Sequence, residues 1–141
     1  MMHRRHLLQG SGAFGLLALA GCANIGNGPP SKARVLVVGG GYGGATAAKY
    51  VRLFSDQKID VTLVEPNDAF VSCPVSNLVL GGSKTIADIT TPYTALAKNH
   101  GVRVIKDTVA SIDPVKKVAV LASGPTIAYD KLILSPGIDL M

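Results

Sequence analysis

Tryptophan is absent from the 141-residue chain, and aromatic residues make up only 5% of it. Proteins that bind single-stranded nucleic acid use aromatic side chains on which bases stack, so this composition argues against that class. Charge is also sparse, with 16% charged residues and a formal net charge of +5. The lysines and arginines are scattered and form no dense basic stripe, which argues against nucleic-acid binding of any kind. A mildly basic surface that faces an acidic protein partner stays open.

Cysteine is scarce as well, with Cys22 near the start of the chain and Cys73 in its body. Because the body contains no second cysteine, a disulfide within it is excluded. No histidine, cysteine or carboxylate cluster has the spacing of a metal site, and no heme-attachment motif occurs. His3 precedes the folded part, and His100 is at the end of an expected helix, where a cation favours the helix dipole. We therefore expect no metal site, and we assign no catalytic residue.

The chain also lacks an apolar run long enough to cross a membrane as a helix, which needs about 20 residues. The longest candidate is Gly12 to Ala20, and glycines interrupt it. Because Arg4-Arg5 precedes this run, the pattern is typical of a twin-arginine signal peptide. That export route carries proteins already folded, often with a cofactor in place. The start of the chain therefore predicts a periplasmic protein.

Two fates of the signal stay open. The residues Leu19-Ala20-Gly21-Cys22 match a lipobox, in which Cys22 would carry a lipid and become the new N-terminus. Ordinary cleavage nearby is the alternative, and it would discard this cysteine. In either case we expect residues 1–31 to be a signal and linker and residues 32–141 to be the folded body. Membrane attachment is expected only through a lipid on Cys22.

The body is apolar enough for a core, since 48% of the chain is hydrophobic. It opens RVLVVGGGYGGATAAKYVRLFSDQKIDVTLVE, residues 34–65. Val35 to Val38 is a short apolar, β-branched run, which is typical of a parallel strand buried on both faces. A helix is predicted from Ala45 to Phe54, and a second strand from Val61 to Val64. The helical period directs four side chains toward the sheet: Ala45, Ala48, Val51 and Phe54.

The glycine run between strand and helix predicts a site for a dinucleotide. Gly39 permits a tight turn, Gly41 lets the backbone approach a pyrophosphate, and Gly44 allows close packing of helix on strand. The helix N-terminus offers unpaired N–H groups to the phosphates. A glycine-rich turn in another kind of α/β protein is the alternative. The strand, glycines, helix, second strand and terminal acid occur together in register, which argues against it. The predicted binding residues of this unit are Gly39, Gly41, Gly43, Gly44, Glu65 and Pro66.

Glu65 completes the pattern, because it comes 21 residues after Gly44 at the end of the second strand. At that spacing a carboxylate accepts hydrogen bonds from a ribose.

The remainder of the body favours FAD over NAD. A helix is predicted over Tyr93 to Asn99, with Thr91 as its cap, Pro92 at its first position and Gly101 as its end. Buried-type strands follow at 102–105 and 131–134, and between them three short strands are expected at 108–112, 117–121 and 126–129. A meander between parallel strands is the layout of FAD domains, whereas simple NAD domains continue to alternate strand and helix. The predicted fold class is α/β, an incomplete Rossmann-like FAD-binding domain with a parallel sheet, helices and a small antiparallel β-meander.

Four segments resemble the flavoprotein subunit of flavocytochrome c sulfide dehydrogenase. They are VVGGGYGGATAAKYVRL (37–53), VTLVEPN (61–67), SCPVSNLVLGG (72–82) and YDKLILSPGIDL (129–140). Members of that family are roughly three times longer, so the resemblance covers an N-terminal segment. One departure is Ser135-Pro136-Gly137, because the last strand of such domains usually ends Ala-Thr-Gly.

The resemblance implies a role for the unpaired thiol. In that family the matching cysteine carries FAD through a thioether to the 8α-methyl of the flavin, so Cys73 is the predicted attachment point. A buried, inert thiol is the alternative. The resemblance also implies that Val109 contacts adenine through its backbone and that Gly137 lies near the cofactor.

The function implied by the resemblance is oxidation of sulfide at FAD and electron transfer to a cytochrome c subunit in the periplasm. The family uses two further redox-active cysteines, which this chain does not contain. Alone it is therefore expected to bind FAD weakly and to oxidise no sulfide. Two alternatives stay open: an FAD oxidoreductase linked to NAD(P)H or to a quinone, and a non-catalytic, lipid-anchored nucleotide-binding module.

Overall fold

The computed structural model describes residues 33–138 of the chain. The predicted signal peptide and lipobox, with Cys22 and His3, lie outside the described residues. Among residues 33–138, no helix is both long and apolar enough to pass through a membrane.

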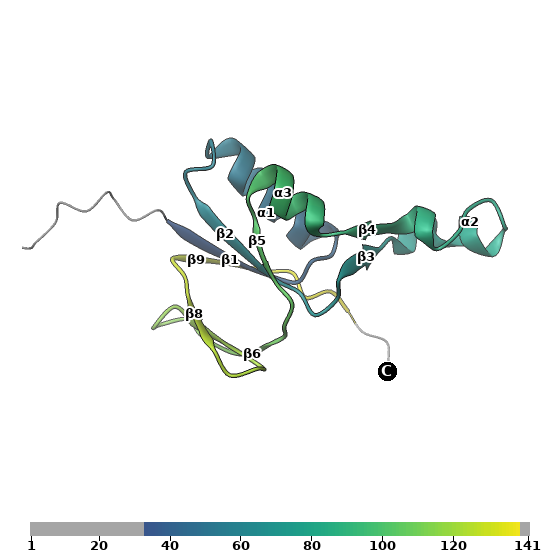
Figure 1. Cartoon of the computed structure of the whole chain (residues 1–141). Helices are drawn as coiled ribbons and strands as arrows, with labels where there is room; N and C mark the ends of the chain where they lie inside the picture. The colour runs from purple at the N-terminus through teal and green to yellow at the C-terminus, as the bar shows by residue number, and fades with distance from the viewer. Residues whose placement is uncertain (1–32, 139–141) are drawn as a thin grey trace, which may run out of the picture. The chain divides into compact units, whose positions relative to one another are not determined.

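A four-stranded parallel sheet forms the centre of the described part (Figure 1). Its strands are β1 (Arg34–Val38), β2 (Asp60–Val64), β5 (Arg103–Ile105) and β9 (Lys131–Leu134), in the order β5-β2-β1-β9. The chain adds β2 and β5 on one side of β1 and then crosses to add β9 on the other. This reversal places a topological switch point between β1 and β9, and in open α/β sheets ligands bind outside the carboxyl ends of the strands at such a point.

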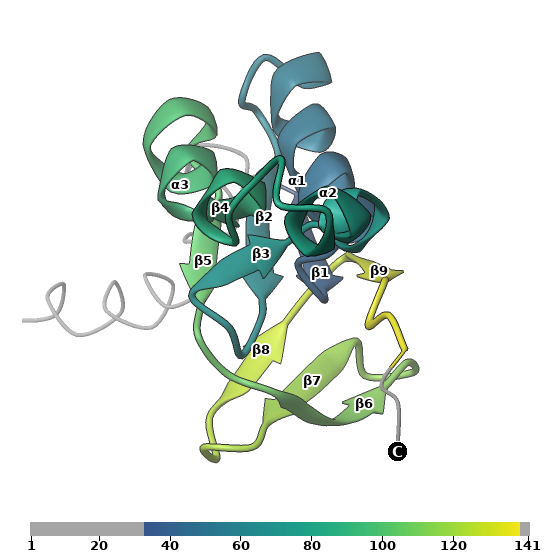
Figure 2. The same ribbon diagram turned by 90° about the vertical axis from the view of Figure 1, so that its right-hand side faces the viewer.

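Two layers cover the sheet, and Figures 1 and 2 show them on opposite faces. Helices α1 (Tyr42–Phe54) and α3 (Thr94–His100) lie on one face. The antiparallel meander lies on the other, and it consists of β6 (Val109–Asp113), β7 (Val118–Leu121) and β8 (Thr126–Ala128). The predicted fold class and the predicted meander are therefore confirmed.

The alternation of side chains along β1 divides the core between these layers. Val35 and Val37 pack with the helices, and Leu36 packs with the meander, because successive strand residues point to opposite faces. Both faces of β1 are therefore buried, which explains its uninterrupted apolar sequence. The helix-side cluster contains Val35, Val37, Ala48, Val61, Leu63, Tyr93 and Val102, and the meander-side cluster contains Leu36, Val64, Ala119, Leu121 and Tyr129.

One predicted contact of the first helix is wrong. Phe54 is 80% exposed, and Arg52 is buried instead. The buried side of α1 runs through Gly44, Ala48 and Arg52 at intervals of four residues. Phe54 comes two residues after Arg52, so it lies roughly 200° around the helix and faces away from the sheet. Ala45 and Val51 do pack against the core, as predicted.

The predicted start of the second helix is also wrong. Residues Thr90–Pro92 form strand β4, which pairs with β3 (Ala69–Val71), and α3 begins only at Thr94. The local capping pattern of Thr91 and Pro92 is overridden by pairing with residues about twenty positions earlier. The end of the helix is as predicted, since Gly101 adopts the left-handed conformation with φ 64°.

The segment between β3 and β4, residues 72–89, is called the Cys73 arm below. It contains the 3-10 helix η1 (Cys73–Val75), the short helix α2 (Ser76–Leu80) and the 3-10 helix η2 (Ala87–Ile89). In Figure 1 the arm extends beyond the β3–β4 pair and away from α1 and α3. The two strands thus form a stem from which the arm extends.

Candidate cofactor site at the carboxyl ends of the sheet

The glycine loop connects β1 to α1, and at Gly39 and Gly44 it is packed against backbone too closely for a side chain. Gly39 has φ 94°, a conformation that favours glycine, and a Cβ there would overlap the backbone of Ser135. A Cβ on Gly44 would overlap the carbonyl oxygen of Gly39. The N–H of Gly39 donates to the carbonyl oxygen of Val64 at 2.9 Å. These contacts hold the loop against the ends of β2 and β9.

Gly41 and the first turn of α1 leave room for a ligand. A Cβ on Gly41 would meet only a Phe70 ring carbon, at 3.9 Å, among the described residues. Gly41 is the N-cap of the helix and has no side chain with which to cap it. The first turn, Tyr42 to Ala45, contains no acidic residue. Its backbone N–H groups and the positive end of the helix dipole therefore suit an anionic group such as a pyrophosphate.

Glu65 lies at the end of β2 with its carboxylate against this loop, and the residue is only 8% exposed. Its Oε2 accepts a hydrogen bond from the N–H of Gly40 at 2.7 Å. Its Oε1 accepts from the backbone N–H of Asn67 at 3.0 Å and from the Asn67 side-chain amide at 2.7 Å. A carboxylate can accept about four hydrogen bonds, so capacity for a hydroxyl of a ribose is left. Pro66 follows directly and is exposed.

Tyr93 belongs to the same cluster, although the sequence predicted only a helical residue there. Its Oη donates a hydrogen bond to the carbonyl oxygen of Gly40 at 2.8 Å, and the side chain is buried at 6% exposure. Burial, with a smaller effect from the nearby charge of Glu65, raises the pKa of Tyr93 to about 12. The hydroxyl therefore stays a donor at neutral pH. No local pattern marks this contact, because its partners are 53 residues apart.

The Cys73 arm is tied to the start of α1. The Tyr42 and Ser72 hydroxyls form a hydrogen bond, and the Tyr42 ring meets the Phe70 ring edge-on at 4.7 Å between centroids. Cys73 follows Ser72 and is exposed. The alternative of a buried thiol therefore does not hold in this structure.

The two remaining predicted residues lie on other elements. Val109 is the first residue of β6, pairs with Leu121 and packs against the meander-side cluster. Gly137 comes after β9 and has φ 79°. The contacts found among residues 33–138 join neither residue to the cluster of Gly40, Glu65 and Tyr93. In the same part of the chain, no group of three or more histidine, cysteine, aspartate or glutamate residues is placed to hold a metal ion.

The chain matches the family described as pyridine nucleotide-disulphide oxidoreductase over residues 33–139. It belongs to this family. A flavoprotein chain of sulfide dehydrogenase [flavocytochrome c] from Chlorobaculum thiosulfatiphilum is 65% identical over 46 residues, which cover 33% of this chain and 94% of that one. Apoptosis-inducing factor homolog B of Dictyostelium discoideum is 35% identical over 106 residues, 75% of this chain and 25% of the relative. The predicted resemblance is thereby confirmed.

Solved structures agree with the assignment. The sulfide:quinone oxidoreductase of Aquifex aeolicus matches with a TM-score of 0.68 and 31% identity over 77% of this chain. The chain covers 25% of the length of that protein and 25% of the length of the Dictyostelium relative. FAD is the cofactor that this family assignment supports, as predicted. The oxidoreductase class is likewise that of the family.

Proposed function

We propose that this chain supplies the FAD-binding segment of a sulfide dehydrogenase flavoprotein, which passes electrons from sulfide to a cytochrome c subunit. The observation that carries the proposal is the 65% identity to the flavoprotein chain of such an enzyme. The glycine loop at the N-terminus of α1 supports it, because its geometry suits the pyrophosphate of FAD. Bound FAD would supply the electron-transfer chemistry, and the described residues would bind and orient it.

The individual roles follow from the positions of the residues. The N–H groups at Gly41, Gly43 and Gly44 would bind the pyrophosphate, and Glu65 with the adjoining Pro66 would face the ribose. Gly39 would hold the turn. The backbone of Val109 would contact adenine, and Gly137 would lie near the cofactor at the end of β9.

Export to the periplasm is part of the proposal, and it rests on the twin-arginine pattern of Arg4-Arg5. Lipid anchoring through Cys22 rests on the lipobox pattern alone. A cofactor bound before export would be retained best if it were attached covalently. The proposed periplasmic location and the proposed covalent attachment of FAD therefore support each other.

We infer that Cys73 carries this bond. Its support is the exposed thiol and the tie between Ser72 and Tyr42, which holds the arm at the end of α1 that faces the pyrophosphate. The cysteine sulfur would bond to the 8α-methyl carbon of the flavin. The hydrogens lost from the thiol and from the methyl group would reduce the flavin ring, which an external oxidant such as dioxygen would then reoxidise.

Acid precipitation of the protein as its host makes it tests this bond. We expect the yellow colour to pellet with the wild-type protein and to stay in the supernatant with Cys73→Ser, which removes the nucleophilic sulfur. Ser83→Ala on the same arm is the matched control and should keep the colour in the pellet. Yellow supernatant from the wild-type protein would show that the flavin is not covalently bound.

A second candidate is a sulfide:quinone reductase, favoured by the 31% identity to the Aquifex aeolicus enzyme. Sulfide-dependent reduction of a soluble quinone, with no reduction of cytochrome c, would favour this candidate. An NAD(P)H-linked flavoprotein would instead be reduced by NAD(P)H. A non-catalytic nucleotide-binding module would bind FAD and be reduced by none of these donors. The 141-residue chain alone is expected to bind FAD weakly and to leave sulfide unoxidised.

A further inference from the structure

Residue 40 of the glycine loop is held from two sides by buried side chains. Its N–H donates to Glu65 Oε2 at 2.7 Å, and its carbonyl oxygen accepts from Tyr93 Oη at 2.8 Å. Gly40, Glu65 and Tyr93 are all buried. A Cβ at residue 40 would lie 2.6 Å from the Tyr93 ring carbon Cζ, so the ring is in contact with the loop backbone.

The hydrogen bond from Tyr93 to the Gly40 carbonyl determines the direction of the next N–H, because that carbonyl belongs to the 40–41 peptide. In a trans peptide the carbonyl of one residue and the N–H of the following residue point to opposite sides. The described chain contains only trans peptides. Because the Gly40 carbonyl points at Tyr93, the N–H of Gly41 points away from Tyr93. Gly41 is also the N-cap of α1, next to the free N–H groups of its first turn.

We propose that Tyr93 is a positioning residue of the pyrophosphate site, whose hydroxyl fixes the 40–41 peptide so that the Gly41 N–H is presented to a phosphate oxygen. This inference rests on the proposed binding of FAD. The dinucleotide would touch the N–H of Gly41, and Tyr93 would act through the peptide behind it. Without the hydroxyl, the buried carbonyl of Gly40 would lose its partner, which favours rotation of the peptide.

Packing of the core explains the ring of Tyr93 and leaves its hydroxyl unexplained. The ring belongs to the helix-side cluster with Val35, Val37 and Ala48, where phenylalanine would pack as well. The hydroxyl reaches out of that cluster to a single acceptor, the carbonyl of Gly40. Tyr93 is also the N-cap residue of α3 and follows β4 directly, so the tyrosine connects the stem of the Cys73 arm to the glycine loop.

Titration of Tyr93→Phe with ADP and with adenosine tests the proposal. The protein is made in its host with Cys73→Ser, which prevents covalent occupation of the site, and is stripped of flavin. We expect Tyr93→Phe to weaken the binding of ADP about tenfold, which is the order of effect for one lost hydrogen bond and its unpaired acceptor. Adenosine lacks the pyrophosphate, so its affinity should change less than about twofold.

Tyr129→Phe is the matched control, because Tyr129 is also buried and its hydroxyl donates to the carbonyl of Asp113 at 3.5 Å in the meander layer. This variant should lower Tm by a similar amount and leave the affinity for ADP unchanged. Equal losses for ADP and adenosine in Tyr93→Phe would overturn the proposal, as would unchanged binding of ADP. If the Cys73→Ser parent bound neither FAD nor ADP, the proposed function itself would fail, and this inference with it.

A measurement on the parent keeps the test independent of how well Tyr93→Phe folds. With glycine-selective ¹⁵N labelling, the Gly41 amide resonance should shift on addition of ADP and stay in place with adenosine. A Gly41 resonance that responds equally to both ligands would contradict the proposed orientation.

Discussion

The carboxyl ends of the parallel strands carry backbone donors, whereas the amino ends carry charged side chains already bound to partners. At the carboxyl ends the glycine loop offers N–H groups without side chains in front of them. At the amino ends Arg52 and Arg34 are bound by acceptors within the fold, including His100 and Asp130, which are 48 and 96 residues away in the chain. Under the proposed function, the carboxyl ends leave backbone donors for a ligand, whereas the amino ends use their charged donors to stabilise the fold.

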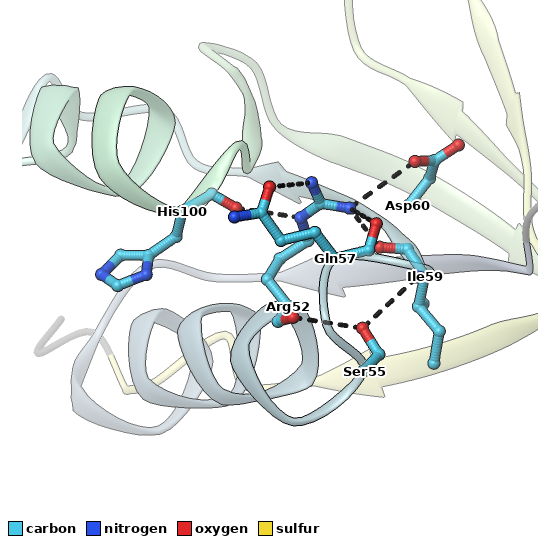
Figure 3. A network of polar contacts seen from close by, with 6 residues as sticks. All are labelled: Arg52, Ser55, Gln57, Ile59, Asp60 and His100. Carbon is cyan, nitrogen blue, oxygen red and sulfur yellow. Dashed lines mark hydrogen bonds and ion pairs between the residues drawn. The ribbon is translucent and has the colours of Figure 1, made fainter.

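Arg52 is the centre of the amino-end network (Figure 3). The residue is only 7% exposed, and its guanidinium donates to three backbone carbonyls. These are His100 at 2.9 Å, Gln57 at 2.9 Å and Ile59 at 2.6 Å. The network thus joins the ends of α1 and α3 to the turn before β2. A cation at two helix C-termini also complements both dipoles.

Arg34 and Asp130 form an ion pair that links β1 to β9 at the same end of the sheet. The carboxylate of Asp130 accepts from the backbone N–H of Arg34 at 2.7 Å and from its guanidinium at 3.2 and 3.1 Å. The two residues are 96 positions apart, so the pair fixes the last strand beside the first. Both side chains are half exposed, and the pair is therefore weaker than the Arg52 network.

The largest effect is expected from Gly44→Ala at the carboxyl end. The new methyl group would overlap the carbonyl oxygen of Gly39, which is backbone and cannot rotate away. We expect the free energy of unfolding to fall by about 3 kcal/mol and FAD binding to be lost. Urea unfolding and flavin content of the purified protein measure the two effects.

Gly81→Ala is its control, because residue 81 ends α2 with φ −77° and a Cβ there would meet only the Asn77 carbonyl oxygen, at 3.3 Å. This variant should stay near the wild-type stability and keep its flavin. A Gly44→Ala protein with full flavin content would contradict the proposal that FAD binds at the carboxyl ends of the strands.

Arg52→Met is expected to have the next largest effect, and on stability alone. Three carbonyls at the amino end would lose their donor, so the free energy of unfolding should fall by about 2 kcal/mol. Flavin content per folded molecule should equal that of the wild type, because the network lies at the opposite end of the strands. Lys98→Met, an exposed lysine near the end of α3, is the control and should change neither quantity. Weaker flavin binding in folded Arg52→Met would refute the separation of the two ends.

The smallest effect is expected from Asp130→Asn, and it depends on pH. The hydrogen bonds and charge of Arg34 lower the pKa of Asp130 from 3.8 to about 2. A carboxylate whose pKa is lower in the folded state stabilises the fold above its unfolded pKa, and this stabilisation is lost as pH falls through the folded pKa. Asp130→Asn should therefore lower Tm slightly at pH 6, and the difference from wild type should shrink as pH falls from 3.8 toward 2. A difference in Tm that stayed constant over that range would exclude the ion pair as its cause.

Several features followed from local sequence alone. The apolar, β-branched run of β1 predicts a strand buried on both faces, because only such a strand needs no polar alternation. The spacing of Gly39, Gly41 and Gly44 predicts the loop, since backbone conformation and close packing each require glycine at fixed positions. Gly101 predicts the end of α3 for the same conformational reason. These are short-range constraints, which neighbouring residues specify without the rest of the chain.

Other features were decided only by the tertiary structure. The pairing of β3 with β4 turned Thr91-Pro92 from a helix cap into a strand, and the helix face around Arg52 left Phe54 exposed. The contact of Tyr93 with Gly40 joins residues 53 positions apart, so no local pattern could predict it. The sequence determined which residues can approach a phosphate, because that property belongs to the glycine backbone itself. Tertiary packing decided which side chains orient that backbone, because hydrogen bonds between distant residues form only when the sheet brings them together.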